Sequence, residues 1–265
     1  MTGRIQVCAG TSGISAGADD VANSFENLLK KHKLNEKFMV IKTGDRGLFR
    51  DVLVDIVFDD GSKTIYERVT PDDVEAIVTS HLLNDEPVKK LLVGTDYDQF
   101  FKDQKRIVLK NCGEIDPNNI DEYLERDGYA AAKKALKMKP ENIIEIMKDS
   151  GLRGRGGAGF PTGLKWQFCF NAKGDQKYII CNADEGDPGA FMDRSILEGD
   201  PHAVIEGMII GAYTIGATEG YVYCRAEYPL ALKILRNAIK QAEDKGFLGD
   251  YIFDSDFSFH LHVKE

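Results

Sequence analysis

A glycine-rich segment at residues 151–166 has the residue types of a phosphate-binding loop. It reads Gly-Leu-Arg-Gly-Arg-Gly-Gly-Ala-Gly-Phe-Pro-Thr-Gly-Leu-Lys-Trp. Glycine has no Cβ, so its main-chain N–H group can approach a bound anion closely and its backbone can adopt left-handed conformations. Arg155 and Lys165 add full positive charges to the segment. A bound nucleotide is therefore the first hypothesis, and a purely structural glycine-rich loop is the alternative.

The flanks of this segment differ from those of the common nucleotide-binding loops. The pattern Gly-x-Gly-x-x-Gly at 154–159 matches the dinucleotide fingerprint, which requires a preceding strand and a helix that opens at its end. Here residues 140–150 predict a helix before the loop, and Phe160-Pro161 block immediate helix growth after it. No Ser or Thr follows Lys165, which excludes a Walker loop. The segment is thus not an ordinary Rossmann turn.

A second segment, at residues 182–189, concentrates carboxylates after the apolar run 178–181, which predicts a buried strand. Ligands of α/β sheets bind outside the carboxyl ends of the strands. The residues predicted to contact polar edges and ribose hydroxyls of a ligand are Asn182, Asp184, Glu185 and Asp187. The alternative is a solvated turn whose acidic residue caps the next helix. Nearby aromatic residues could face a flat ring or pack in the core: Phe160, Trp166, Phe168 and Phe170.

The composition is that of a globular protein with one large or two modest domains. The chain has 265 residues, of which 43% are hydrophobic and 29% charged. A net charge of −9 and a pI near 5.2 argue against nucleic acid as the main partner. The first residues contain neither the apolar core of a signal peptide nor a membrane span, so we expect a cytoplasmic protein with no membrane insertion.

Cysteine and histidine give no complete metal site. The five cysteines are scattered without a C-x-x-C pair, which predicts buried thiols rather than a disulfide framework. The alternating run 257–263 predicts a strand in which His260 and His262 share one face. These histidines could hold a metal, but no third ligand is near, so a solvated polar face is favoured.

The order of predicted elements indicates an α/β chain with two domains. Residues 1–90 follow a β-α-β-β-β-α order, and the hairpin signal Asp-Asp-Gly-Ser lies at 59–62. Residues 91–120 form a connecting arm with a strand-like piece at 107–109. In residues 121–265, strands alternate with helices, which implies parallel pairing. The predicted strands are 5–7, 37–42, 53–58, 63–69, 178–181, 221–224 and 257–263. The predicted helices are 19–31, one beginning at Thr70-Pro71, 140–150, 191–198, 201–215 and 229–245.

The motifs at 154–166, 181–194 and 197–202 together resemble the NADH-binding flavoprotein subunit of respiratory complex I and its soluble relatives. Those relatives are diaphorase-type subunits of NAD-linked hydrogenases, formate dehydrogenases and electron-bifurcating complexes. The resemblance covers residues 105–265, and residues 1–90 resemble a thioredoxin-like ferredoxin domain. It implies a thioredoxin-like α+β domain followed by a Rossmann-like FMN/NADH-binding α/β domain.

The resemblance also implies cofactors, partners and roles. FMN would be surrounded by Gly154, Arg155, Gly156, Gly157, Lys165, Asn182, Asp184 and Glu185, with Glu185 as the catalytic residue. NADH would lie against Phe160, Phe168 and Asp187. The chain would pass a hydride from or to NAD(H) through FMN and on to iron–sulfur protein subunits of an electron-transfer complex. A non-catalytic scaffold or docking relative that has lost cofactor binding is the alternative.

Two departures from the family qualify this expectation. The first domain of the relatives binds a [2Fe–2S] cluster through four cysteines, whereas the matching positions here are Cys8, Gly13, Asp45 and Phe49, so we expect no cluster. The flavin-pocket segment and the [4Fe–4S] ligands that follow in the family are not in this sequence. A [4Fe–4S] cluster is expected only if a further segment exists, and the chain alone is not expected to sustain NADH oxidation.

Overall fold

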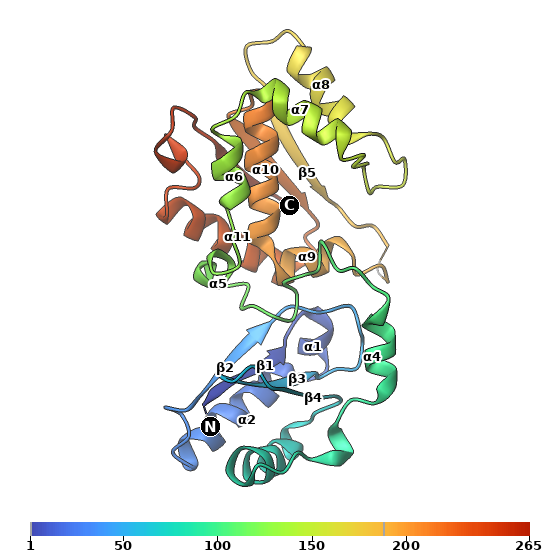
Figure 1. Cartoon of the computed structure of the whole chain (residues 1–265), viewed down its shortest axis with the longest axis vertical. Coiled ribbons are helices and arrows are strands. Elements are labelled where there is room, and N and C mark those ends of the chain that lie inside the picture. The colour runs from blue at the N-terminus through green and yellow to red at the C-terminus, as the bar shows by residue number, and fades with distance from the viewer. Residues whose placement is uncertain (1, 188) are drawn as a thin grey trace. The chain divides into compact units, whose positions relative to one another are not determined.

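The computed structural model describes residues 2–187 and 189–265 and divides into two compact units. The first unit comprises Met1–Pro117 together with Glu198–Asp200, and the second comprises Asn118–Leu197 and Pro201–Glu265. In Figure 1 the colour runs from blue, at the start of the first unit, to red, at the end of the second. Both units combine a sheet with helices, which confirms the predicted α/β class.

The first unit is built on a four-stranded sheet in the order β2-β1-β3-β4. Its strands are β1 (Gly3–Cys8), β2 (Phe38–Thr43), β3 (Val54–Phe58) and β4 (Lys63–Tyr66). Strand β1 pairs in parallel with β2 and antiparallel with β3, and β3 forms a hairpin with β4. The helical elements are α1 (Thr11–Ser15), α2 (Ala18–Lys31), η1 (Pro71–Asp73), α3 (Val74–Ala76), η2 (Ile77–Leu82), η3 (Lys89–Leu91) and α4 (Thr95–Lys102). This order and pairing is that of a thioredoxin-like unit, as predicted.

Helical periodicity explains how α2 packs onto this sheet. Val21, Phe25 and Leu29 recur every four residues and are at most 2% exposed. They join β1 and β3 in one apolar core. The helix predicted at Thr70 begins as expected with a capping box, in which the main-chain amide of Thr70 donates to Asp73 Oδ2 at 3.2 Å. It continues as the successive turns η1, α3 and η2.

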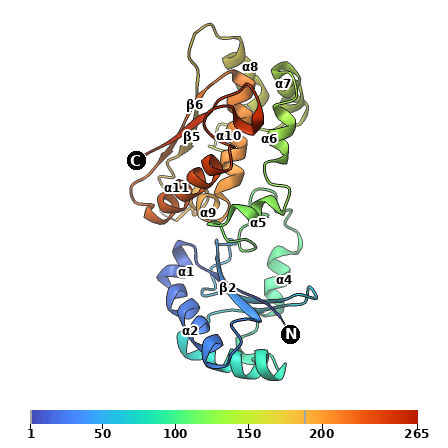
Figure 2. The same cartoon turned by 90° about the vertical axis from the view of Figure 1, so that its left-hand side faces the viewer.

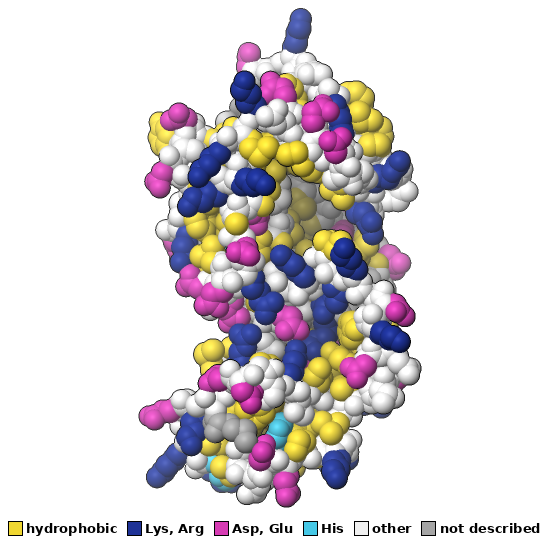
Figure 3. Space-filling model, viewed as in Figure 1, with side chains coloured by type: hydrophobic (Ala, Val, Ile, Leu, Met, Phe, Trp, Pro, Cys, Tyr) yellow, Lys and Arg dark blue, Asp and Glu magenta, His cyan; other side chains and the backbone are white. Residues whose placement is uncertain are grey.

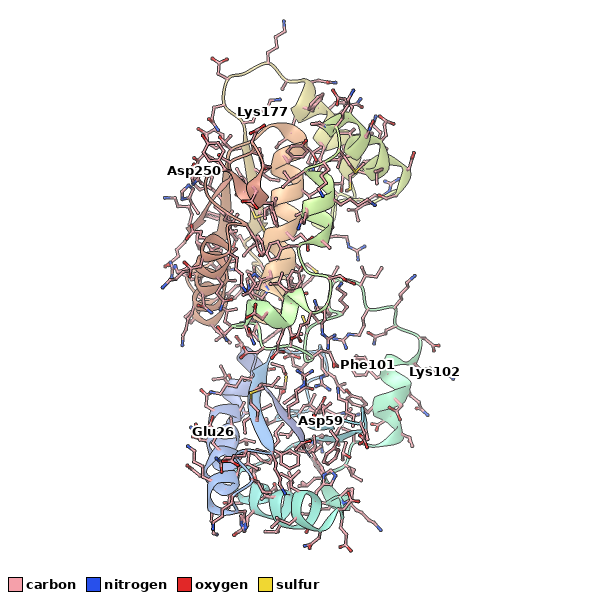
Figure 4. All side chains as sticks on the ribbon, turned by 60° about the vertical axis from the view of Figure 1, so that its left-hand side comes forward. Glu26, Asp59, Phe101, Lys102, Lys177 and Asp250 are labelled. Carbon is pink, nitrogen blue, oxygen red and sulfur yellow. The ribbon has the colours of Figure 1, made fainter. Side chains whose placement is uncertain are left out.

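Residues 89–117 fold with the first unit and contain helix α4, which the sequence pattern did not predict. The strand-like piece predicted at 107–109 is wrong, because Ile107 and Val108 are 68% and 56% exposed and neither lies in a strand. Phe101 and Lys102 mark the end of α4 in Figure 4. The Phe101 ring lies 5.0 Å from that of Tyr97, between centroids.

A buried charge cluster fixes this segment onto the sheet. Arg46 donates to Asp55 Oδ2 at 2.8 Å, to Tyr97 Oη at 2.9 Å and to the carbonyl of Gly113 at 3.1 Å. Lys63 Nζ lies 2.6 Å from the same Asp55 oxygen. Arg46 is 3% exposed and Asp55 is fully buried. Burial opposes the charge of Arg46, but the carboxylate of Asp55 raises the pKa of the guanidinium.

The second unit has a three-stranded, wholly parallel sheet in the order β5-β6-β7. Its strands are β5 (Tyr178–Ala183), β6 (Glu219–Cys224) and β7 (His260–Lys264). Its helical elements are α5 (Ile120–Leu124), α6 (Ala130–Ala135), α7 (Pro140–Asp149), α8 (Thr162–Asn171), α9 (Asp193–Gly199), α10 (Pro201–Ile215), α11 (Pro229–Asp244) and η4 (Ile252–Asp254). Figure 2 shows α10 running beside β5 and β6. The predicted parallel pairing is confirmed.

Strand β5 lies at an edge of this sheet, and the prediction that it is buried is wrong. Tyr178 is 52% exposed and Ile180 is 67% exposed. Successive side chains of a strand point to opposite faces, so one set points away from α10 and meets solvent. Figure 4 marks Lys177 just before β5 and Asp250 in the loop between α11 and β7. Among the described residues, none of the helices has the length and apolar character needed to span a membrane.

Candidate functional site

The glycine-rich loop lies between two helices, α7 and α8, rather than between a strand and a helix. Its base is closed by the amide of Gly154, which donates to the carbonyl of Phe160 at 2.8 Å, and by that of Thr162, which donates to the carbonyl of Leu152 at 2.9 Å. Helix α8 then begins at Thr162, directly after Pro161. The expectation that this is not an ordinary Rossmann turn is confirmed by these flanks.

Glycine is needed inside this loop for conformation rather than for internal packing. Gly157 and Gly159 have φ values of 96° and 62°, which side chains with a Cβ rarely adopt. A Cβ added at Gly156 or Gly157 would meet no heavy atom within 4 Å. The loop therefore presents main-chain groups to open space, where a ligand can approach them.

The acidic loop that follows β5 is held in shape by its own side chains. Asn182 Oδ1 accepts from the amide of Asp184 at 3.2 Å, and Asp187 Oδ1 accepts from that of Gly189 at 3.0 Å. Glu185 is 6% exposed, and its carboxylate accepts from the amides at the start of α9. Pro188 lies outside the described residues. Glu185 therefore caps the next helix, α9, as the alternative interpretation of this segment predicted.

The two loops enclose one cavity of about 640 Å³. Eight of the eleven predicted site residues line it: Gly154, Arg155, Gly156, Lys165, Asn182, Asp184, Glu185 and Asp187. Gly157, Phe160 and Phe168 do not line it. A cavity of this size is within the range of small-molecule and cofactor sites.

An adjacent pocket of about 330 Å³ shares Gly154 and Lys165 with the first cavity and is more apolar. Phe160 and Trp166 line it, while Phe168 lies beside it with ring centroids 6.3 Å from Phe160. Phe160 and Phe168 are 43% and 61% exposed. Figure 3 shows hydrophobic side chains gathered over the region of α8. These exposed rings are suited to stacking on a flat ligand rather than to the core.

Charge is divided between the two walls of the larger cavity. Arg155 and Lys165 supply positive charge from the glycine loop and α8, and Asp184, Glu185, Asp187 and Asp193 supply negative charge from the acidic loop and the start of α9. Burial and the neighbouring charge of Glu185 raise the pKa of Asp193. Arg225 Nε lies 3.7 Å from Asp184 Oδ1 and offsets part of this negative charge. The arrangement suits a ligand with an anionic group and hydroxyl groups.

Part of the cavity wall was not predicted from the sequence. Gly186, Ala190, Met192 and Asp193 also line the cavity. They lie within the motif 181–194, but their types alone gave no sign of ligand contact. Each histidine of β7 lies beside an acidic side chain: His260 Nε2 is 3.2 Å from Asp250 Oδ1, and His262 Nε2 is 2.7 Å from Glu219 Oε2. Over the described part of the chain, no cluster of three metal-binding side chains occurs.

At the first two cluster-ligand positions of the first unit, the geometry does not suit a [2Fe–2S] cluster. Cys8 is 1% exposed, and its Sγ donates to the carbonyl of Gly44 at 3.5 Å. Burial raises the pKa of this thiol, so the thiolate form that binds iron is disfavoured. A Cβ at Gly13 would lie 2.2 Å from the carbonyl oxygen of Cys8, which leaves no room for a cysteine.

The other two positions carry residues other than cysteine, Asp45 and Phe49. Asp45 is 2% exposed and accepts from the hydroxyl of Ser12 at 2.5 Å and the amide of Gly47 at 2.8 Å. Phe49 is 56% exposed. A cluster needs four ligands converging on it, and of these four positions only Cys8 carries a thiol.

The fold and the site define a class: an α/β protein with a thioredoxin-like unit and a Rossmann-like unit whose sheet edge carries a cofactor-sized cavity. Residues 147–265 match the family model described as the Nuo51 FMN-binding domain. The resemblance predicted from the motifs at 154–166 and 181–194 is thereby confirmed for this part of the chain.

The chain is similar to two curated relatives. It is 57% identical over 163 residues to the NADP-reducing hydrogenase subunit HndC of Solidesulfovibrio fructosivorans, covering 62% of this chain and 33% of that protein. It is 53% identical over 157 residues to an NADH-quinone oxidoreductase subunit of Aquifex aeolicus, covering 59% and 37%. The chain thus spans about a third of the length of these relatives. A crystal structure of an NAD⁺-reducing [NiFe]-hydrogenase is 23% identical with a TM-score of 0.46, over 98% of this chain and 42% of the other.

Proposed function

We propose that this chain is the FMN- and NAD(H)-binding part of an NADH dehydrogenase-type flavoprotein subunit. The observation that carries the proposal is the 640 Å³ cavity, whose walls come from the glycine loop, α8 and the acidic loop after β5. The match of residues 147–265 to an FMN-binding family supports it independently. Relatives named for NADH-quinone and NADP-reducing activity support a nicotinamide nucleotide as the electron donor or acceptor.

The residues of the cavity fit FMN by their chemistry. Main-chain groups around Gly156, together with Arg155 and Lys165, would hold anionic or electron-rich parts of the cofactor. Asn182 and Asp184 would bind polar edges and hydroxyl groups. Glu185 would supply a fixed negative charge to the cavity wall, because backbone amides hold its carboxylate in place.

Bound FMN would accept two electrons as a hydride from a nicotinamide and release them one at a time. Phe160, Phe168 and Asp187 would position the nicotinamide nucleotide on the other side. Stacked, oriented rings shorten the path of the transferred hydride. We further propose that iron–sulfur protein subunits of a larger complex exchange electrons with this site. A cytoplasmic location stays a prediction.

A titration of the purified chain with FMN tests the proposal. Binding should quench flavin fluorescence, and the Lys165→Ala variant should bind more weakly. Lys173→Ala is the matched control, because Lys173 is an exposed lysine of the same unit that does not line the cavity. NADH and NADPH are then added in turn, and bleaching of the flavin absorbance identifies the nucleotide. A chain that binds no FMN would favour the scaffold alternative.

A further inference from the structure

Glu185, in the acidic loop, is held at both its side chain and its main chain. Its Oε1 accepts from the amide of Met192 at 2.6 Å and its Oε2 accepts from the amide of Arg194 at 3.1 Å. Its main-chain carbonyl accepts from the hydroxyl of Tyr228 at 2.5 Å and from Arg225 at 3.4 Å. A loop residue with this many partners has little freedom to move.

Arg194 and Tyr228 form a second connection behind the same loop. The Arg194 guanidinium carbon lies 3.8 Å from the ring centre of Phe191 and 4.6 Å from that of Tyr228. Arg194 is 9% exposed and Tyr228 is 5% exposed, so this stacking is shielded from water. Tyr228 therefore acts twice: its hydroxyl holds the carbonyl of Glu185, and its ring holds Arg194.

Tyr228 itself is positioned by the helices and strands of the second unit rather than by residues that line the cavity. It directly precedes α11, whose first residue is Pro229, and it follows the end of β6 at Cys224. Neither Tyr228 nor Arg194 lines the 640 Å³ cavity, whereas Asp184, Gly186 and Asp187 on the loop do. The contacts of Tyr228 therefore connect the start of α11 to the acidic loop, which forms part of the cavity wall.

We propose that Tyr228, together with Arg194, is a positioning residue that fixes the acidic loop in the shape that binds the cofactor. The inference rests on the proposed function and deepens it. The inference also makes Glu185 the link between the clamp formed by Tyr228 and Arg194 and the cavity, since both carboxylate oxygens of Glu185 accept main-chain N–H groups. The geometry thus gives this carboxylate an organising role instead of a proton-transferring one.

The test compares Tyr228→Phe with Tyr213→Phe in the full chain. Each substitution removes one hydroxyl that donates to a main-chain carbonyl; Tyr213 donates to Met138 at 2.8 Å, away from the cavity. The ring of residue 228, and hence its stacking on Arg194, is kept. Loss of one such hydrogen bond should weaken FMN binding about tenfold in Tyr228→Phe. Tyr213→Phe should change the dissociation constant less than about twofold, at a similar loss of stability.

Two further readouts separate positioning from general destabilisation. The visible circular dichroism of bound FMN should change in Tyr228→Phe and not in Tyr213→Phe. Hydrogen exchange of peptides spanning 184–194 should accelerate in Tyr228→Phe and not in Tyr213→Phe, because the amides of Met192 and Arg194 lose a fixed acceptor. Arg194→Lys keeps the charge but removes the flat stacked group, and it should shift both readouts in the same direction.

The outcomes distinguish this inference from the proposed function. If the unmodified chain binds no FMN, the proposed function fails, and hydrogen exchange still decides whether Tyr228 fixes the loop. Equal FMN affinity and equal exchange in Tyr228→Phe and Tyr213→Phe would overturn the positioning role. Faster exchange at 184–194 with weaker FMN binding, seen only in the Tyr228 and Arg194 variants, is the expected result.

Discussion

The substitution Asp55→Asn should destabilise the first unit far more than its single lost charge suggests. Asp55 is fully buried and bonded to Arg46 at 2.8 Å and Lys63 at 2.6 Å through the same oxygen. An asparagine keeps the shape but leaves two positive charges facing each other, and Arg46 is 3% exposed and cannot reach water. Breaking a buried ion pair on one side costs about 3–5 kcal/mol of unfolding free energy.

A matched control uses an exposed ion pair of the same unit. Lys31 Nζ and Glu75 Oε1 are 3.3 Å apart, and both side chains are 63% exposed. Glu75→Gln removes the same charge, and the loss should stay below about 1 kcal/mol.

Thiol labelling of Cys8 in a urea series is the assay, since Cys8 is 1% exposed and reacts only when this unit opens. Mass spectrometry identifies the labelled peptide, so the free energy refers to the first unit alone. If Asp55→Asn and Glu75→Gln shift the labelling midpoint equally, the buried cluster does not stabilise the unit as argued.

Three further outcomes are expected. Lys165→Ala should lower the FMN retained on gel filtration more than Lys165→Arg, because charge is the proposed contribution; equal retention in both variants and the unmodified chain would remove Lys165 from the site. Anaerobic incubation with iron and sulfide should leave the first unit without acid-labile sulfide, since only Cys8 of the four ligand positions is a thiol; a stoichiometric [2Fe–2S] signal would contradict this. Burial lowers the pKa of His202 from 6.5 to about 4. As pH falls, the unfolded chain therefore binds a proton at His202 before the folded chain does. About 3 kcal/mol of the free energy of unfolding should be lost as pH falls from 6.5 toward 4. His202→Gln should flatten the pH dependence of the urea midpoint. An unchanged slope of midpoint against pH in this variant would refute the attribution to His202.

Local patterning predicted most elements of both units, because apolar periodicity and capping signals act over short distances. The helix at Ala18–Lys31, the hairpin at 59–62 and the three parallel strands all follow from such signals. The strand at 107–109 was wrongly predicted, since a short apolar run needs a partner strand and none pairs with it there. The exposure of β5 depends on its edge position, which is a tertiary property.

The cavity was partly predictable for a similar reason. Residue types at 154–159 and 182–187 indicated ligand contact, and the structure brings both segments to one cavity. The clamp formed by Arg194 and Tyr228 was not predictable, because an arginine between two rings has no sequence pattern. Its contacts join residues 185 and 228, which the chain separates by α9, α10 and β6.

The packing of Gly13 has a consequence for engineering the first unit. A Cβ there would lie 2.2 Å from the carbonyl oxygen of Cys8, so a cysteine introduced at this position alone would distort the local backbone. It would also form no cluster until positions 45 and 49 carried thiols as well, since a cluster needs all four ligands. Installing a cluster by design therefore requires three new cysteines together with a rebuilt backbone around residues 8–13.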